Sequence, residues 1–453
     1  MSEHLAVISA TSIQDYIFRS NRLREQVGAS RNVKDALGQW RERALFVGGG
    51  NAVVRFPSLQ EAHRQVFEWS RRQLEDAPGL RFSVGFSEVT ENAGEYYEAA
   101  LDNRQACEES PSGGGEPGAL PICVTCPSTG LAATTDGEDQ QGRPISAEAA
   151  KKQQESGRVE RLIGGWKFPL DLDKLGTTEN ASQVAVVHAD GNGIGKLVSE
   201  ALAQGEGGIE RLGQLSKELS AIGRRARIQL IDELRTRAEV WHQEEQLKLK
   251  PLEKGGFYMP IRLIVDGGDD ATWVCAGKIG LATAARYLQI FEQVAREAGK
   301  EQLTACAGVA IVPRGYPFSR AYSLAANLCG SAKRKSREES GLDFQVVLGG
   351  STQGLEDLRS DTSVYKRHSA RPYRLGEEWN ALEAAIIYFQ QEWPRSRAKS
   401  LLQAFGRNSP GDEIAIHEHR NYKLPRSASQ EQVFDALEVF DFHLPWATPA
   451  SAR

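Results

Sequence analysis

The chain has 453 residues, with 55 Lys and Arg against 60 Asp and Glu, which gives a formal net charge of −5 at pH 7. This length predicts two to four domains, and the charge balance excludes a polybasic protein that binds nucleic acid through its overall charge. No run of eighteen apolar residues occurs, so we expect no transmembrane helix. The amino terminus is not typical of a secretory leader, and the six cysteines do not form a disulfide framework, so we expect a cytoplasmic protein with reduced thiols.

The first part of the chain alternates strand-like and helix-like segments. A strand comes first, followed by a helix, a hairpin with a glycine tip, a second helix and a last strand; the segments are 5–8, 13–27, 44–56, 61–75 and 80–86. The tip reads Gly48-Gly49-Gly50-Asn51, and the last strand contains Gly85. The pattern predicts a β-α-β-β-α-β order.

A later part of the chain repeats this order. Its segments are 184–188, 209–234, a strand pair around Gly267-Gly268-Asp269-Asp270, 279–298 and 303–309. From the glycine tip to the glycine of the last strand there are 37 residues in the first copy, Gly48 to Gly85, and 41 in the second, Gly267 to Gly308. We therefore expect two ferredoxin-like palms, an α+β fold, with helices on one face of each sheet.

Composition divides the chain into four predicted parts. Residues 1–107 form the first palm, and residues 108–160 form an insertion in which Gly, Pro and Ser are frequent and apolar periodicity is weak. Residues 161–365 form the second palm. Residues 366–453 form a carboxyl-terminal helical domain, because apolar residues recur at helical spacing between Glu377 and Phe405.

The two predicted palms differ in the residues that carry chemistry. In the second palm the first strand ends at Asp190, and the hairpin tip carries Asp269 and Asp270. The first palm has Ser9-Ala10-Thr11-Ser12 and Gly50-Asn51 at the corresponding places, without a carboxylate. The second palm is therefore the candidate catalytic domain, and the first is degenerate.

Carboxylates at a strand end and at a neighbouring hairpin tip are suitable ligands for Mg²⁺ or Mn²⁺. We expect two such ions to activate an attacking hydroxyl and to neutralise a departing pyrophosphate, with the ligands Asp190, Gly191, Asp269 and Asp270. The three aspartates are the candidate catalytic residues. Gly191 and the tip glycines Gly267-Gly268 are candidate phosphate-binding residues, because a glycine lets the backbone approach a triphosphate. The same tetrapeptide also occurs in ordinary turns, and its place between two strands favours the catalytic interpretation.

A helix predicted over residues 324–335 carries Lys333 near its carboxyl end. A lysine at this place can hold a β- or γ-phosphate as a compact positive charge. The alternative is a solvated helix end, in which Lys333, Arg334 and Lys335 complement the helix dipole.

Cys123 and Cys126 have the two-residue spacing of half a zinc site. No second cysteine pair or histidine pair follows within the insertion, so a structural Zn²⁺ needs further ligands from elsewhere in the chain or from another chain. The other four cysteines are expected to fill core positions.

In their order, these residues resemble the large subunit of type III CRISPR effector complexes, a polymerase with two palm domains that is distantly similar to GGDEF diguanylate cyclases. The matching segments are Ile8 to Ser30, Val47 to Asn51, Ala189 to Gly191, Gly267 to Asp270 and Ser331 to Lys333. They span both palms, and the pairing of an inactive palm with an active one is the specific part of the likeness. The family often carries an amino-terminal HD nuclease domain. This sequence starts at the first palm and has no His-Asp dipeptide, so we expect no DNA cleavage.

The resemblance implies a nucleotidyltransferase that converts ATP into cyclic oligoadenylate, a signal in antiviral defence. It implies metal binding by Asp190, Asp269 and Asp270, phosphate contacts by Gly267-Gly268 and a triphosphate contact by Lys333. It also implies guide RNA and small effector subunits as partners, and a zinc ribbon at the insertion, of which only one cysteine pair is present.

Two alternatives remain open at the level of sequence. One is a scaffold subunit that binds RNA and proteins and whose palm chemistry is vestigial. It is suggested by the basic stretches Lys333 to Arg337 and Lys366 to Arg374, which are able to follow a phosphate backbone. The other is a stand-alone synthase of a cyclic dinucleotide, acting as a homodimer outside any effector complex.

Overall fold

The computed structural model describes residues 2–109, 123–134, 137–139, 141–158, 162–176, 182–203, 207–336, 338–349, 354–360, 364–407, 409–419 and 422–447. The chain forms two compact units. The first comprises residues 1–171, 194–224 and 263–269, and the second comprises residues 172–193, 225–262 and 270–453. Part of the predicted insertion, residues 110–122, lies outside the described residues. Within these ranges, no helix combines the length and the apolar character needed to cross a membrane.

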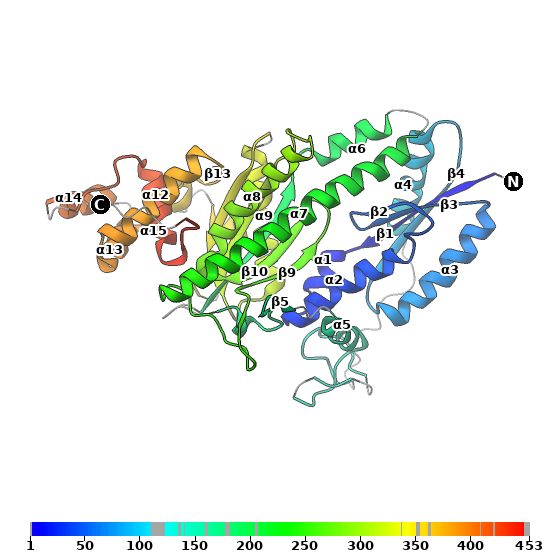
Figure 1. Ribbon diagram of the computed structural model, residues 1–453, viewed down its shortest axis with the longest axis horizontal. Coiled ribbons are helices and arrows are strands. Elements are labelled where there is room, and N and C mark those ends of the chain that lie inside the picture. The colour runs from blue at the N-terminus through cyan, green and yellow to red at the C-terminus, as the bar shows by residue number, and fades with distance from the viewer. Residues whose placement is uncertain are drawn as a thin grey trace. The chain divides into compact units, whose positions relative to one another are not determined.

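The first unit is built on a four-stranded antiparallel sheet with the order β2-β3-β1-β4. Its elements (Figure 1) are β1 (His4–Thr11), α1 (Ile13–Phe18), α2 (Leu23–Gly38), β2 (Ala44–Gly48), β3 (Asn51–Phe56), α3 (Leu59–Asp76), β4 (Arg81–Glu88), α4 (Ala93–Glu109), α5 (Ala147–Gly157), β5 (Leu162–Ile163), β6 (Trp166–Lys167) and α6 (Ile194–Leu202). A β-α-β-β-α-β chain gives this strand order when β1 lies between β3 and β4. The ferredoxin-like fold predicted for this part is confirmed.

The helix predicted over residues 13–27 is two helices, α1 and α2. Ser20 lies in the turn between them, where its Oγ donates to Glu25 Oε2 (2.5 Å) and its carbonyl oxygen accepts from Gln26 Nε2 (2.8 Å). These side-chain contacts offer the backbone an alternative to a continuous helix.

Helices cover both faces of this sheet, so the prediction of helices on a single face was wrong. Leu5 and Val7 of β1 pack in one core cluster with Ala100 of α4. On the opposite face the ring of Phe82 in β4 packs edge-on against Trp69 of α3, with centroids 4.6 Å apart. The second layer is added by α4, which the six-element pattern did not include.

The second palm is formed by a six-stranded sheet with the order β13-β12-β11-β7-β10-β9. The elements from residue 172 onward, α6 apart, are η1 (Leu172–Lys174), β7 (Gln183–Gly191), α7 (Gly208–Gln243), β8 (Phe257–Tyr258), β9 (Ile261–Asp266), β10 (Ala271–Ala276), η2 (Gly277–Ile279), α8 (Gly280–Glu297), β11 (Ala305–Pro313), α9 (Phe318–Lys335), β12 (Gly341–Val346), α10 (Leu355–Leu358), α11 (Val364–His368), β13 (Tyr373–Arg374), α12 (Glu377–Glu392), α13 (Arg395–Gly406), α14 (Pro410–His419), α15 (Gln430–Val439) and η3 (Phe440–Phe442). Strand β7 is antiparallel to β10 and β11, and β12 runs parallel to β11. The order β11-β7-β10-β9 repeats that of the first sheet, so the second ferredoxin-like palm is confirmed.

A glycine in the last strand of each palm allows the following helix to pack closely. A Cβ on Gly85 of β4 would lie 1.9 Å from the carbonyl oxygen of Ala100 in α4. A Cβ on Gly308 of β11 would lie 2.0 Å from the carbonyl oxygen of Ala325 in α9. These are the two glycines whose spacing indicated the repeat, and the helix–strand contact is the physical reason for both.

The carboxyl-terminal helices α12 to α15 form the predicted helical region. Their core consists of fully buried apolar residues, among them Leu382, Phe389, Leu401, Phe405 and Leu437. Helix α12 packs on α15, and α13 packs on α14 and α15.

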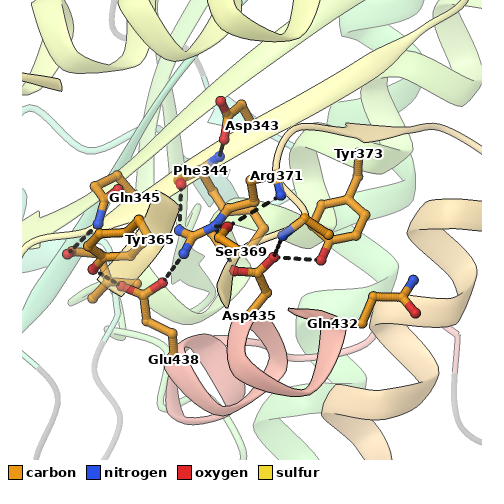
Figure 2. Close-up of polar contacts among 12 residues, drawn as sticks. Asp343, Phe344, Gln345, Tyr365, Ser369, Arg371, Tyr373, Gln432, Asp435 and Glu438 are labelled. Atoms are coloured by element: carbon orange, nitrogen blue, oxygen red, sulfur yellow. Dashed lines mark hydrogen bonds and ion pairs between the residues drawn. The ribbon is translucent and has the colours of Figure 1, made fainter. Parts of the chain in front are cut away.

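A buried charge cluster connects α15 to the chain just before β13 (Figure 2). The guanidinium of Arg371 donates from Nε to Asp435 Oδ1 (2.9 Å) and from Nη2 to Glu438 Oε2 (2.5 Å). The Tyr373 hydroxyl donates to Asp435 Oδ2 (2.6 Å), and the Tyr365 hydroxyl donates to Glu438. The side chains of Arg371 and Asp435 are fully buried. This cluster is therefore a structural connection between the second palm and the helical domain.

Candidate active site

Two carboxylates of the second unit lie at the ends of adjacent strands. Strand β7 ends in Asp190-Gly191, and Asp270 directly precedes β10. Ala189 pairs with Ala271 in antiparallel register, so the next position along β7, Asp190, comes opposite Asp270. Residues directly opposite in antiparallel strands have Cβ atoms about 4.5–5.5 Å apart. The register therefore brings together two of the three aspartates singled out in the sequence.

Lys333 of α9 reaches the same strand end. Its Nζ lies 2.5 Å from Asp190 Oδ2 and 2.7 Å from the carbonyl oxygen of Gly191. The side chains of Lys333 and Asp190 are 29% and 37% exposed, so the ion pair is half-buried. The sequence predicted a phosphate contact for this lysine, whereas its contact in the structure is with the carboxylate. A carboxylate and a carbonyl oxygen converge on one positive charge here, and such oxygen donors suit Mg²⁺ or Mn²⁺.

A small cavity of about 280 Å³ opens beside this ion pair. It is lined by Asn192, Gly193, Lys333 and Arg334. Two cations and a glycine at its wall make it suitable for an anionic group such as a phosphate. Arg334 therefore belongs to the candidate site, although the sequence analysis did not place it there.

Asn192 fixes the loop that follows β7. Its backbone N–H donates to the carbonyl oxygen of Thr304 (2.8 Å), and its Nδ2 donates to Thr304 Oγ1 (2.9 Å) and to the carbonyl oxygen of Glu339 (3.1 Å). The side chain is buried and crosses from the loop to the segment after α9. The sequence analysis missed this residue; an amide within the glycine-rich run Asp190 to Gly195 was the available signal.

His188 is a buried neighbour of the two carboxylates that the sequence analysis also missed. Its Nδ1 lies 3.0 Å from Thr272 Oγ1 and 3.4 Å from Asp270 Oδ1. Burial lowers the pKa of His188 to about 4, although the charge of Asp190 raises it; Lys333 lowers it further. The imidazole is therefore neutral at pH 7 and adds no positive charge beside the aspartates.

The hairpin tip is divided between the two units. Residues 263–269, which include Gly267 to Asp269, belong to the first unit, and Asp270 belongs to the second. Within the first unit, Lys34 Nζ contacts Asp266 Oδ2 (2.8 Å), and a Cβ on Gly268 would lie 3.3 Å from Ser220 Oγ. The site geometry in the second unit therefore rests on Asp190, Asp270 and Lys333, and the roles of Gly267 to Asp269 stay predictions.

The two cysteines of the insertion, Cys123 and Cys126, differ in burial. Cys126 is buried and its Sγ lies 3.3 Å from Ser128 Oγ, whereas Cys123 is exposed. Burial opposes ionisation of Cys126, but hydrogen bonds, led by that of Ser128, outweigh it and lower the pKa of the thiol to about 6. Across the described part of the chain, no three His, Cys, Asp or Glu side chains gather closely enough to hold a metal ion. A Zn²⁺ at this pair stays a prediction.

The basic stretch Lys366 to Arg374 contains residues whose charges are used internally. Arg371 lies in the buried cluster described above, and Arg374 Nε pairs with Glu339 Oε2 (3.3 Å). Lys335 Nζ donates to the carbonyl oxygen of Pro372 (2.6 Å). The observation that suggested an RNA-binding scaffold is therefore weaker than the sequence alone indicated.

The fold and the site define a palm protein, in which a duplicated ferredoxin-like sheet carries paired aspartates only in its second copy. The family described as Cas10/Cmr2, second palm domain, matches residues 183–340. This part of the chain is therefore similar to the second palm of Cas10/Cmr2, in agreement with the resemblance to type III CRISPR large subunits. None of the curated proteins compared with the chain matches it.

The matches to solved structures extend over almost the whole chain. The crystal structure of a Csm1-Csm4 cassette in complex with pppApApA has a TM-score of 0.53 and 14% identity, covering 97% of this chain and 69% of that chain. The apo Csm1-Csm4 cassette has a TM-score of 0.49 and 15% identity, with 97% and 70% covered. Csm1 of T. onnurineus has a TM-score of 0.43 and 14% identity, with 97% and 69% covered. The inference of a common fold depends on the first of these.

Proposed function

We propose that the second palm is a metal-dependent nucleotidyltransferase that joins ATP molecules into cyclic oligoadenylate, or a related cyclic nucleotide, and releases pyrophosphate. The observation that carries the proposal is the placement of Asp190 opposite Asp270, with the Lys333 ammonium against Asp190. The match to the Cas10/Cmr2 second palm supports it, and the similar Csm1-Csm4 structure was obtained with pppApApA.

In the proposed reaction a ribose hydroxyl of one ATP attacks the α-phosphate of another. An O–P bond forms, the bond from the α-phosphorus to the pyrophosphate oxygen breaks, and the hydroxyl proton passes to water. Two Mg²⁺ or Mn²⁺ ions would supply Lewis-acid charge and an activated hydroxyl. Their ligands would be those predicted, namely Asp190, Gly191, Asp269 and Asp270. Lys333 would hold the phosphate oxygens as their negative charge develops, which is the kind of electrostatic stabilisation that contributes most to such transfers.

Turnover of labelled ATP by the purified full chain tests this proposal. We expect Asp270→Ala to lower product formation in Mn²⁺ by on the order of a hundredfold, the scale of losing one preorganised electrostatic group. Asp266→Ala is the matched control, because it removes a carboxylate from the same hairpin that is bonded to Lys34. Mass spectrometry of reactions with each nucleoside triphosphate identifies the product. Unchanged product and rate with Asp270→Ala would contradict the proposal.

We further propose that the chain works as a subunit of a type III effector, together with small effector subunits and guide RNA. The likeness to a chain of a Csm1-Csm4 cassette over 97% of this chain supports such an assembly. Co-expression with the subunits encoded beside it, followed by co-purification, tests the assembly. Turnover by the isolated chain as a homodimer, without any partner, would favour the stand-alone synthase instead.

A further inference from the structure

We infer that the Lys333 ammonium competes with a divalent cation for the same two oxygens, so that Lys333 controls when the site takes up metal. The inference rests on the proposed function for the nature of the site. Its test measures metal affinity without nucleotide, so its outcome does not depend on turnover.

The competition follows from the contacts of Lys333. Its Nζ is within hydrogen-bond distance of Asp190 Oδ2 (2.5 Å) and of the carbonyl oxygen of Gly191 (2.7 Å). If Asp190 and Gly191 hold a Mg²⁺ ion, their oxygens would lie at about 2.0–2.1 Å from it, a distance that leaves little room for an ammonium on the same two oxygens. Two positive charges at such short separation repel strongly where water is partly excluded. Metal bound to Asp190 and Gly191 therefore requires that the ammonium move away.

The packing of α9 sets this position for Lys333. Gly308 allows α9 to approach β11 closely, and Lys333 lies on the same helix two turns beyond Ala325, the residue at that contact. The loop that carries Gly191 is itself fixed by the hydrogen bonds of Asn192. Both partners of the ion pair are thus held by buried structure, and the contact differs from a surface salt bridge between two mobile side chains.

The cavity beside the ion pair provides a second position for the ammonium. Lys333 lines it together with Gly193 and Arg334, and its four-carbon stem lets Nζ swing over a short distance. A phosphate in this cavity would attract Lys333 away from Asp190 and release two oxygens to a metal ion. Nucleotide and metal would then bind cooperatively, and by linkage each would raise the affinity for the other by the same factor.

Titration of the full chain with Mn²⁺, followed by the EPR signal of the free ion, tests this inference without nucleotide. We expect Lys333→Gln to bind Mn²⁺ roughly tenfold more tightly than the wild type, because one competing charge-assisted hydrogen bond is lost. Arg334→Gln is the matched control. It removes the same charge from the same cavity, and within the described residues Arg334 makes no hydrogen bond to Asp190 or Gly191. We expect it to change the affinity by less than about threefold, the scale of a screened charge.

Two further variants make the outcome decisive. Lys333→Arg keeps a cation at the ion pair, so its Mn²⁺ affinity should stay close to that of the wild type, which also shows that the position tolerates substitution. Asp190→Asn should remove the Mn²⁺ binding that Lys333→Gln strengthens. Equal shifts in the two Gln variants, no gain in Lys333→Gln, or wild-type affinity in Asp190→Asn would each overturn the inference. A wild-type chain that binds Mn²⁺ with these relative affinities but makes no product from ATP would instead contradict the proposed function and leave the inference standing.

Discussion

Replacing Arg371 by Met should destabilise the second unit by about 3–5 kcal/mol, the range measured when one partner of a buried ion pair is removed. The guanidinium is fully buried and is the shared partner of two carboxylates, Asp435 and Glu438. It also donates to the carbonyl oxygen of Phe344 (2.9 Å) and lies over the ring of that residue, 4.5 Å from its centroid. Met fills part of the volume but supplies neither the charge nor the donors.

The size of this effect follows from what remains after the substitution. Asp435 keeps the hydrogen bonds from the Tyr373 hydroxyl and the Ala370 N–H, and Glu438 keeps the bond from Tyr365. These contacts satisfy oxygen lone pairs but carry no positive charge. A buried carboxylate without a counter-charge is costly, so most of the loss comes from the two stranded acids.

Unfolding in urea, followed by circular dichroism and tryptophan fluorescence, measures the change. Arg395→Met is the matched control: Arg395 is 68% exposed, and its partner Asp441 keeps a second ion pair with Lys399 (2.7 Å). We expect that variant to lose less than about 1 kcal/mol. A second comparison replaces all three charges of the cluster, Arg371→Met with Asp435→Leu and Glu438→Met, and should regain much of the stability. A loss below about 1 kcal/mol for Arg371→Met would refute the reasoning.

Two other substitutions test the packing and the electrostatics. Gly308→Ala in β11 should cost about 2–3 kcal/mol of unfolding free energy in the same assay, because its Cβ would lie 2.0 Å from the carbonyl oxygen of Ala325 in α9. The control is Gly330→Ala in α9, which should not be destabilising, because its Cβ would meet only a side-chain nitrogen at 3.7 Å. Burial raises the pKa of Glu438 above its ordinary value of 4.5, although the charge of Arg371 lowers it. At pH values between 4.5 and this raised pKa, Glu438 holds a proton in the folded protein that it has lost in the unfolded chain. The stability that this proton contributes is lost as the pH rises through that range. The unfolding free energy of the wild type should therefore fall relative to that of Glu438→Gln over the same range. A difference in unfolding free energy that does not change with pH would contradict this.

The repeat could be predicted from the sequence because its signals are local. Strand and helix periodicity, the glycine tips and the positions of Gly85 and Gly308 are visible in short windows. Both sheets contain the four strands of the predicted ferredoxin-like palm, and β12 and β13 extend the second sheet beyond that pattern. The approach of Asp190 to Asp270 was also predictable, since a hairpin next to the first strand leaves few other arrangements. The sequence did not predict that helices cover both faces of the first sheet, because one face is covered by α4, a helix outside the repeated pattern.

The contacts of charged side chains were the least predictable part of the site. Lys333 and Asp190 are 143 residues apart in sequence, and nothing local distinguishes a phosphate-binding lysine from one paired with a carboxylate. Arg371 appeared as part of a basic stretch, although burial makes it a structural residue. Asn192 was unremarked because its partners, Thr304 and Glu339, lie far along the chain. Each of these assignments needs tertiary packing, which periodicity does not encode.

The register of the two sheets makes Ser9 the counterpart of Asp190. Gly85 pairs with the residue two positions before Ser9, and Gly308 pairs with the residue two positions before Asp190. Asn51 pairs with Ser9, so it is the counterpart of Asp270. In the first palm the two neutral side chains satisfy each other, with Ser9 Oγ donating to Asn51 Oδ1 at 2.5 Å.

The helices that follow β4 and β11 also differ in charge at equivalent positions. Gly85 approaches Arg104 of α4 as Gly308 approaches Cys329 of α9, so the position one turn later is Glu108 in the first palm and Lys333 in the second. A lysine beside Ser9 and Asn51 would have no carboxylate to pair with, whereas two carboxylates on adjacent strands repel each other unless a cation lies close. The acids and the lysine are therefore interdependent, and both are absent from the first palm. The glycine contact that sets the helix against the sheet is present in both copies, which separates what the fold requires from what the chemistry requires.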